Sequence, residues 1–221
     1  MHQMQTCIAR INAMAPKARF SRVKSVFVGN HMKKVTIIGC GALGSNAALF
    51  LRNCANMTVI DYDRVERKNV LSQFHAQGSV GKLKVMAVQQ IMQFLFGTKV
   101  SIIPHKLTVL NVREILSGTD LILDCLDNGE SRRIVQKYAR DSGTPCLHGA
   151  LAGAGGFGRV IWDEDFAIDN ETGVGAATCE DGFFLPFIAV VATHLAYSAQ
   201  QFLETGKKIG FQISPAGTIA V

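Results

Sequence analysis

Short apolar runs alternate with longer stretches of helical hydrophobic spacing along most of this chain. Short apolar runs rich in β-branched residues are typical of strands that are buried on both faces of a sheet. Their alternation with helices predicts an α/β fold with a mostly parallel sheet, helices on both faces and antiparallel C-terminal strands. We predict strands at about 34–38, 57–60, 100–104, 121–123, 146–150, 159–162, 209–213 and 218–221, and helices that end near 53 or cover about 80–96, 112–116, 131–141 and 185–204.

The length and composition favour one domain. With 221 residues, of which 48% are apolar, the chain can bury a full core without disulfides or metals. We predict a single domain over 34–221, preceded by an N-terminal arm or helical segment over 1–33. The net charge of +6 comes from the N-terminal part, because residues 1–60 contain no Asp or Glu. Such a start fits a transit peptide, a nucleic-acid arm or an arm directed at a polyphosphate.

Composition also bears on partners and compartment. Aromatic residues for base stacking are sparse, so we expect no nucleic-acid partner. The most apolar stretch, 183–199, is interrupted by Pro186 and His194 and is shorter than the roughly 20 residues that a bilayer requires, so we expect no membrane span. The six cysteines form no CxxC pair, so neither a disulfide framework nor a structural zinc is expected. Reduced thiols favour a cytoplasmic location.

A glycine-rich loop lies between the first predicted strand and helix. Gly39-Cys-Gly-Ala-Leu-Gly44 has the G-x-G-x-x-G spacing that lets phosphates approach the N–H groups of a helix N-terminus. Asp61 follows the second strand, 22 positions after Gly39, where an acid that binds a ribose is expected in a Rossmann-like sheet. These features fit NAD and ATP equally well.

The residues that follow favour ATP. Gly81-Lys-Leu-Lys84 stands at the start of a predicted helix, and a lysine there can neutralise the charge that develops on a departing pyrophosphate. Asp127 and Asn128 come just after the fourth strand, at the edge of the sheet where ligands bind, and one carboxylate is sufficient to help hold a magnesium ion on phosphates. Taken singly, a lysine such as Lys84 is more often a solvated helix residue, and an acid such as Asp127 is more often a helix N-cap. Their joint order is what favours the nucleotide site.

With these motifs, the chain resembles the ThiF/MoeB/HesA family of the ubiquitin-activating-enzyme-like superfamily, over about 19–205. Arg19-Phe-Ser-Arg22 is similar to the family's N-terminal arginine element, and Asp127-Asn-x-x-x-Arg132 is similar to its Asp-Asn-x-x-x-Arg motif. The resemblance implies an ATP-dependent adenylyltransferase that activates a carboxylate, such as the C-terminus of a ubiquitin-like or sulfur-carrier protein or of a peptide, as an acyl-adenylate. It further implies a homodimer in which Arg22 reaches the ATP of the partner subunit.

The resemblance also assigns roles to single residues. Lys84 and Arg22 are implied to stabilise the pyrophosphate, Asp127 to hold Mg²⁺, and Cys179 to align with a cysteine that some relatives use for a covalent linkage. The implied nucleotide-binding residues are Gly39, Gly41, Ala42, Gly44, Asp61, Asp63, Asn69, Gln73, Lys84, Asp127 and Asn128.

The chain departs from the family pattern in three places. Ser72 stands where the family has an arginine next to the triphosphate, the paired CxxC motifs are missing, and the segment between Trp162 and Cys179 is too short for a separate cysteine domain. Two alternatives therefore stay open: a catalytically weakened nucleotide-binding scaffold of the same family, and an NAD-dependent oxidoreductase on the same sheet topology. The sequence does not identify the activated carboxylate.

Overall fold

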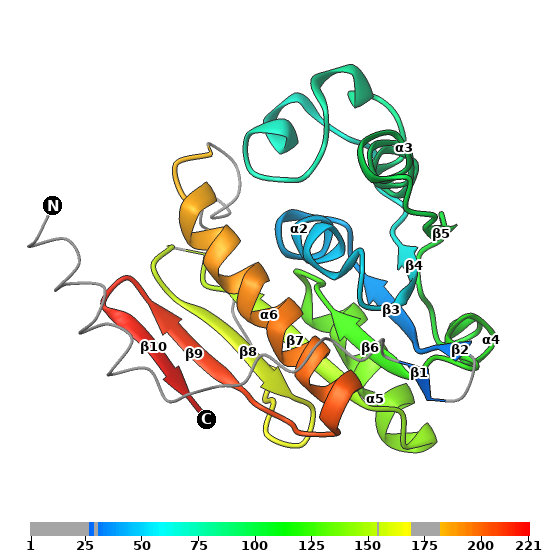
Figure 1. The fold of residues 1–221 in the computed structure, drawn as a ribbon, viewed down its shortest axis with the longest axis vertical. Helices are drawn as coiled ribbons and strands as arrows, with labels where there is room; N and C mark the ends of the chain where they lie inside the picture. The colour runs from blue at the N-terminus through cyan, green and yellow to red at the C-terminus, as the bar shows by residue number, and fades with distance from the viewer. Residues whose placement is uncertain (1–26, 29–30, 154, 169–181) are drawn as a thin grey trace, which may run out of the picture.

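The computed structural model describes residues 27–28, 31–153, 155–168 and 182–221. Its centre is an eight-stranded sheet with the order β10-β9-β8-β7-β6-β3-β4-β5 (Figure 1). Strands β5, β4, β3, β6 and β7 are parallel, and β8, β9 and β10 are antiparallel to their neighbours. The predicted α/β fold is confirmed. The strands are β3 (Lys34–Ile38), β4 (Asn56–Ile60), β5 (Ser101–Ile103), β6 (Leu121–Asp124), β7 (Cys146–Leu151), β8 (Gly158–Trp162), β9 (Phe211–Ser214) and β10 (Gly217–Ala220).

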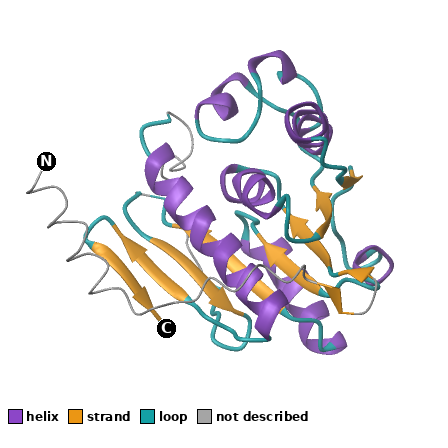
Figure 2. Cartoon of the chain, in the orientation of Figure 1, coloured by secondary structure: helices purple, strands orange, loops and turns teal. Residues whose placement is uncertain are grey.

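Helices cover both faces of the sheet (Figure 2). The α-helices are α2 (Ala42–Leu51), α3 (Lys84–Phe96), α4 (Val112–Leu116), α5 (Gly129–Ser142) and α6 (Leu185–Thr205), with 3-10 turns η1 (Arg67–Leu71) and η2 (Gln77–Ser79) between β4 and α3. None of the helices in the described ranges combines the length and the apolar composition needed to cross a bilayer. A two-stranded hairpin, β1 (Phe27–Val28) with β2 (His31–Met32), lies in the range that we assigned to the N-terminal arm.

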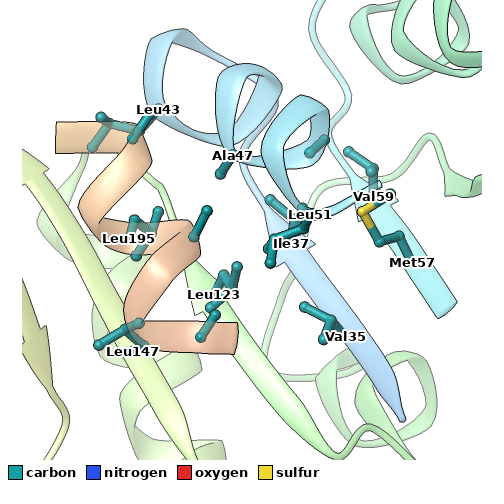
Figure 3. Close-up of a cluster of buried hydrophobic side chains, with 14 of the residues drawn as sticks. Val35, Ile37, Leu43, Ala47, Leu51, Met57, Val59, Leu123, Leu147 and Leu195 are labelled. Atoms are coloured by element: carbon teal, nitrogen blue, oxygen red, sulfur yellow. The ribbon is translucent and has the colours of Figure 1, made fainter. Parts of the chain in front are cut away.

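The central strands are mostly apolar because each contributes to a core on both faces. On one face, Val35 and Ile37 of β3 pack with α2, α3 and α6, and Figure 3 shows this larger core. On the other face, Ile38 packs with Ile122 and with apolar residues of α4 and α5. The period of two along each strand therefore distributes its side chains between two helical layers.

Two boundaries differ from the prediction for identifiable reasons. Helix α3 begins at Lys84 and not near residue 80, because Gly81 has φ +88° and Leu83 is extended. Helix α5 begins at Gly129, two residues earlier than predicted, because Asn128 provides its N-cap by accepting a hydrogen bond from Ser131 N–H. The first shift matters for function, because it makes Lys84 the first residue of its helix.

The topology creates a crevice between β3 and β6. After β3 the chain enters α2 on one face, and after β6 it enters α5 on the other face. The two loops leave neighbouring parallel strands in opposite directions, which is the switch point where ligands bind in open α/β sheets. The loop 39–41 and the loop 125–128 therefore meet at the carboxyl edge of the sheet.

Candidate nucleotide-binding site

A cavity of about 760 Å³ opens at this carboxyl edge. Most of the predicted nucleotide-binding residues line it, although they come from five separate segments of the chain. Gly44 and Asn69 do not line the cavity, and Arg22 and Cys179 lie outside the described residues. The predicted residues that line it are Gly39, Gly41, Ala42, Asp61, Asp63, Gln73, Lys84, Asp127 and Asn128.

The three glycines of the loop have different roles. Gly39 has φ +90°, and a Cβ there would lie 2.7 Å from the Cys125 carbonyl oxygen. A Cβ on Gly44 would lie 1.9 Å from the Gly39 carbonyl oxygen, so this glycine permits the close packing of helix on strand. A Cβ on Gly41 would meet no atom within 4 Å, and Gly41 lines the cavity. Of the three glycines, only Gly41 therefore leaves room for a ligand.

The N-terminus of α2 is suited to an anion. Gly41 is its N-cap and supplies no side-chain cap, and its first turn contains no acidic residue. The first N–H groups of a helix lack intrahelical partners and carry the positive end of the helix dipole. Together with the open space at Gly41, this end of α2 provides a place for a phosphate.

Asp61 closes the other side of the loop. Its Oδ2 accepts a hydrogen bond from Cys40 N–H (2.6 Å), and its Oδ1 accepts one from Asp63 N–H (2.8 Å). Burial raises the pKa of Asp61, while these two hydrogen bonds and nearby Lys84 act in the opposite direction. Each carboxylate oxygen has a second acceptor site beyond these bonds, which fits the hydroxyl pair of a ribose.

Lys84 is part of the site and not a solvated helix residue. Its N–H donates to the Asp63 carbonyl oxygen (2.8 Å), and its Nζ lies 2.9 Å from Asp63 Oδ2. Burial alone would lower the pKa of Lys84, but the hydrogen bond to Asp63 and the charge of Asp61 outweigh it and raise the pKa. The cavity therefore contains an amine that is protonated at neutral pH and lies close to two acids, Asp61 and Asp63.

Asp127 and Asn128 divide two roles between them. Asn128 is the N-cap of α5, and its Nδ2 donates to Asp127 Oδ1 (3.3 Å). Asp127 is exposed and lines the cavity. Because Asn128 is the N-cap of α5, the Asp127 carboxylate is available for a ligand. Within the described ranges no group of three or more His, Cys, Asp or Glu side chains could hold a metal ion. A magnesium ion at Asp127 would depend on phosphate oxygens and water for its other ligands.

The segment from η1 to Gln73 has both structural and cavity-facing residues. Asn69 is buried and forms a reciprocal capping box with Glu66, which accounts for it without a ligand. Gln73 lines the cavity, and its buried Oε1 has no hydrogen-bond partner among the residues that the structure describes. An unsatisfied buried acceptor is costly, so Gln73 has an unused capacity for a ligand or water.

The position of Ser72 is buried. Its side chain is 1% exposed, and its carbonyl oxygen accepts a hydrogen bond from Asn46 Nδ2 (3.3 Å). Neither Lys82 nor Arg67, the nearby cations that could replace an arginine at this position, lines the cavity. These two cations therefore do not replace the positive charge of the arginine that the family pattern has at this position.

A buried network of charged groups below the cavity was not predicted as a unit. Asp124 and His148 are register partners on β6 and β7, and His148 Nδ1 lies 2.7 Å from Asp124 Oδ2. The same oxygen accepts from Arg132 Nη1 (2.9 Å), and Arg132 Nη2 also donates to the carbonyl oxygens of Leu126 and Gly149. In the sequence, the sign of this network is an acid, Asp124, and a histidine, His148, inside otherwise apolar strands. The partners of these two residues depend on the order of the strands in the sheet.

The chain belongs to the ThiF family, whose pattern matches residues 30–215. It is 32% identical over 123 residues to the SAMP-activating enzyme E1 of Haloferax volcanii, covering 53% of this chain and 45% of that protein. It is 35% identical over 126 residues to the adenylyltransferase and sulfurtransferase MOCS3 of Arabidopsis thaliana, covering 55% of this chain and 27% of that protein. The chain thus spans less than half the length of these curated relatives.

Solved structures show the same fold. The crystal structure of E. coli MccB with ATP matches with a TM-score of 0.68 at 17% identity and covers 86% of this chain and 62% of its own. The crystal structure of PaaA matches with a TM-score of 0.67 at 16% identity and covers 100% of this chain and 80% of its own. At these identities the likeness extends to the arrangement of the strands and helices.

Proposed function

We propose that this protein is an ATP-dependent adenylyltransferase that activates a carboxylate as an acyl-adenylate. The observation that carries the proposal is that the open N-terminus of α2 at Gly41, the amine of Lys84 and the carboxylate of Asp127 all line one cavity. The relatives named as an activating enzyme E1 and as an adenylyltransferase support this reaction, and the match to MccB with ATP supports the nucleotide.

In this reaction an oxygen of the substrate carboxylate attacks the α-phosphorus of ATP. The bond from that phosphorus to the oxygen bridging the β-phosphate breaks, and pyrophosphate leaves with the negative charge. The protein positions the two substrates and stabilises this charge. Asp61 would hold the ribose, Gly41 and Ala42 the phosphates, and Lys84 the departing pyrophosphate. Magnesium held by Asp127 would supply further neutralisation of phosphate charge.

The substrate that we propose is the C-terminal carboxylate of a ubiquitin-like or sulfur-carrier protein or of a peptide. This follows from the relatives, one of which is named for activating SAMP. The cavity is also lined by Ala150, Ala152 and Gly153, and a Cβ on Gly153 would meet no atom within 4 Å, so this stretch leaves space for an extended chain end. We also propose a cytoplasmic location and a covalent role for Cys179, both of which rest on the sequence.

ATP–pyrophosphate exchange with magnesium tests the reaction directly. Purified protein is assayed with and without candidate ubiquitin-like proteins or peptides, with Asp127→Ala as the blank. Exchange that requires a carboxylate partner and disappears in the variant supports adenylylation. Tight ATP binding without exchange for any partner would favour the scaffold that the buried Ser72 suggests, and absence of ATP binding would favour the nicotinamide alternative.

We propose a homodimer in which Arg22 of one subunit reaches the ATP of the other. Mixing of Arg22→Ala subunits with Lys84→Ala subunits tests this arrangement. In a mixed dimer, the subunit that keeps Lys84 faces a partner that keeps Arg22, so one complete site forms and exchange returns. If Arg22 acts within its own subunit, no complete site forms and the mixture stays as inactive as its components.

A further inference from the structure

His148 lies fully buried between two carboxylates. Its Nδ1 is 2.7 Å from Asp124 Oδ2, and its Nε2 is 3.1 Å from Asp163 Oδ1. An ionised carboxylate only accepts hydrogen bonds, so both ring nitrogens must donate for both bonds to exist. Two donating nitrogens define an imidazolium, and a neutral histidine would leave one of these buried contacts without a proton. The geometry alone therefore indicates a charged histidine under the cavity.

The Asp124 side of this histidine leads to the nucleotide. Asp124 Oδ1 accepts a hydrogen bond from Leu126 N–H (3.0 Å), and Arg132 holds the Leu126 carbonyl oxygen while it pairs with Asp124. Leu126 immediately precedes Asp127, the proposed magnesium-binding acid. The position of the 125–128 loop is therefore set by the pair that His148 contacts.

The Asp163 side leads to a second segment that lines the cavity. Asp163 Oδ2 also accepts from Arg140 Nε (2.7 Å), so the start of the 163–168 segment is fixed to both β7 and α5. The Phe166 ring of this segment stacks on the His148 ring with centroids 4.1 Å apart and planes 4° apart. Phe166 and Ile168 both line the cavity. One imidazolium thus contacts the supports of two segments of the cavity wall.

We propose that His148, an imidazolium in the wild type, is a positioning residue whose two ring-nitrogen hydrogen bonds couple the 125–128 loop on the nucleotide side to the 163–168 segment on the substrate side. Its catalytic consequence rests on the proposed function, whereas the coupling itself is a property of the fold. Binding of ATP against Asp127 then orders the wall that faces the second substrate. Hydrogen bonds run from the 125–128 loop through Asp124, His148 and Asp163 to the 163–168 segment, and Arg132 adds a second contact, with its guanidinium 5.4 Å from the Phe166 ring centroid.

The surrounding charges support this state. Burial alone would lower the pKa of His148, but nearby Cys146 and the hydrogen bonds to the two carboxylates raise it to about 11. Burial acts to raise the pKa of Asp163, yet its bonds to His148 and Arg140 lower it to about 2, so this acid is ionised at neutral pH. The titratable and charged groups around the ring are Asp124, Arg132, Arg140, Cys146 and Asp163, with Arg159 across the Phe166 ring.

Two variants separate the coupling from simple loss of the fold. His148→Gln removes the imidazolium and leaves two buried carboxylates facing an uncharged side chain. Asp163→Asn is nearly isosteric: its amide nitrogen can donate to a neutral His148 Nε2, while its oxygen still accepts from Arg140 Nε. In Asp163→Asn, residue 163 therefore stays hydrogen-bonded to both His148 and Arg140, while His148 carries one proton fewer. His194→Gln changes a histidine on α6 whose Nδ1 lies 2.8 Å from the Val190 carbonyl oxygen of the same helix, and this variant is the matched control.

Hydrogen–deuterium exchange with and without magnesium and ATP measures the coupling. In the wild type and in His194→Gln, ATP should slow exchange in both 125–128 and 163–168. In Asp163→Asn both segments should remain protected, and in His148→Gln protection should be confined to the nucleotide side. We expect pyrophosphate exchange in His148→Gln to fall on the order of 10- to 100-fold, as for other small misplacements, and Asp163→Asn to stay close to the wild type.

Histidine-labelled NMR reads the proton independently of any activity. Both His148 N–H groups should persist in the wild type as the pH rises above 6.5, the ordinary histidine value, and Asp163→Asn should lower the pH at which one proton is lost. A neutral His148 in the wild type, or ATP protection of 163–168 that survives His148→Gln, would overturn the proposal. If the wild type shows no pyrophosphate exchange, the proposed function fails, and the NMR titration together with ligand-free exchange of the two segments in His148→Gln still decides the coupling.

Discussion

The Nζ of Lys84 lies 2.9 Å from Asp63 Oδ2, and the Lys84 N–H donates to the carbonyl oxygen of the same residue. The pair joins the first residue of α3 to the loop after β4. When no phosphate is bound, the Asp63 carboxylate neutralises the charge of the Lys84 amine and holds this amine at the cavity edge. A phosphate that enters the cavity competes with Asp63 for this lysine, and the half-exposed carboxylate of Asp63 can then be solvated.

Lys84→Met should lower pyrophosphate exchange by about 10²–10³-fold, the usual effect of losing one group that stabilises transition-state charge. The free energy of unfolding should change by about 1 kcal/mol or less, because the partner of Lys84 is half exposed. Lys82→Met is the matched control, since Lys82 is exposed and bonds Gln90. Equal losses in both variants would contradict a specific role for Lys84.

Gly41→Ala and Gly44→Ala should fail in different ways. Gly44→Ala places a methyl group against the Gly39 carbonyl oxygen, so its free energy of unfolding should fall by at least about 1–3 kcal/mol. Gly41→Ala meets open space and should melt like the wild type, while its methyl group occupies room that we assign to phosphate. Thermal melts combined with ATP titration distinguish the two, and normal ATP affinity in Gly41→Ala would argue against a phosphate at this loop.

Asp127→Ala should abolish magnesium-dependent exchange while leaving the fold intact, because its side chain is exposed and the N-cap of α5 is Asn128. Glu130→Ala removes another exposed acid in the first turn of α5 and should retain activity. The measurement is exchange as a function of magnesium concentration. A similar magnesium dependence in the two variants would exclude Asp127 as the metal-binding acid.

The stability of the protein should depend on pH through His148. Because its pKa is 6.5 when free and about 11 in the fold, its stabilising contribution is complete below pH 6.5 and declines as the pH rises towards 11. Asp163 acts in the opposite direction: its pKa falls from 3.8 to about 2, so its contribution is present above pH 3.8 and is lost on acidification. Denaturant titrations should therefore show the greatest difference between wild type and His148→Gln below pH 6.5, and the difference should shrink in alkali. A constant difference would contradict a charged His148.

Much of the fold follows from local pattern. The runs Lys34–Ile38 and Leu121–Asp124 are apolar enough to require cover on both faces, and this identified them as central strands. The glycine loop, Asp61 and Asp127 follow directly after such strands, so their place at the carboxyl edge could be predicted before any contact was known.

The roles of individual residues were less accessible. The family resemblance assigns Asn69 to the nucleotide site, yet in the fold it forms the capping box of η1 and does not line the cavity. The helix N-cap is Asn128 and not Asp127, one residue earlier. Choices of this kind depend on single backbone dihedral angles, which hydrophobic periodicity does not determine.

The sequence by itself determined the order of strands and helices, the phosphate loop and the acids and lysine that follow it, because these depend on local spacing and on the direction of each strand. Only the tertiary structure decided that Lys84 pairs with Asp63 and that His148 lies between Asp124 and Asp163. These partners are separated along the chain by 21, 24 and 15 residues. Their contacts depend on which strands are neighbours and in what register, and register is set by burial of the whole sheet and not by any one segment.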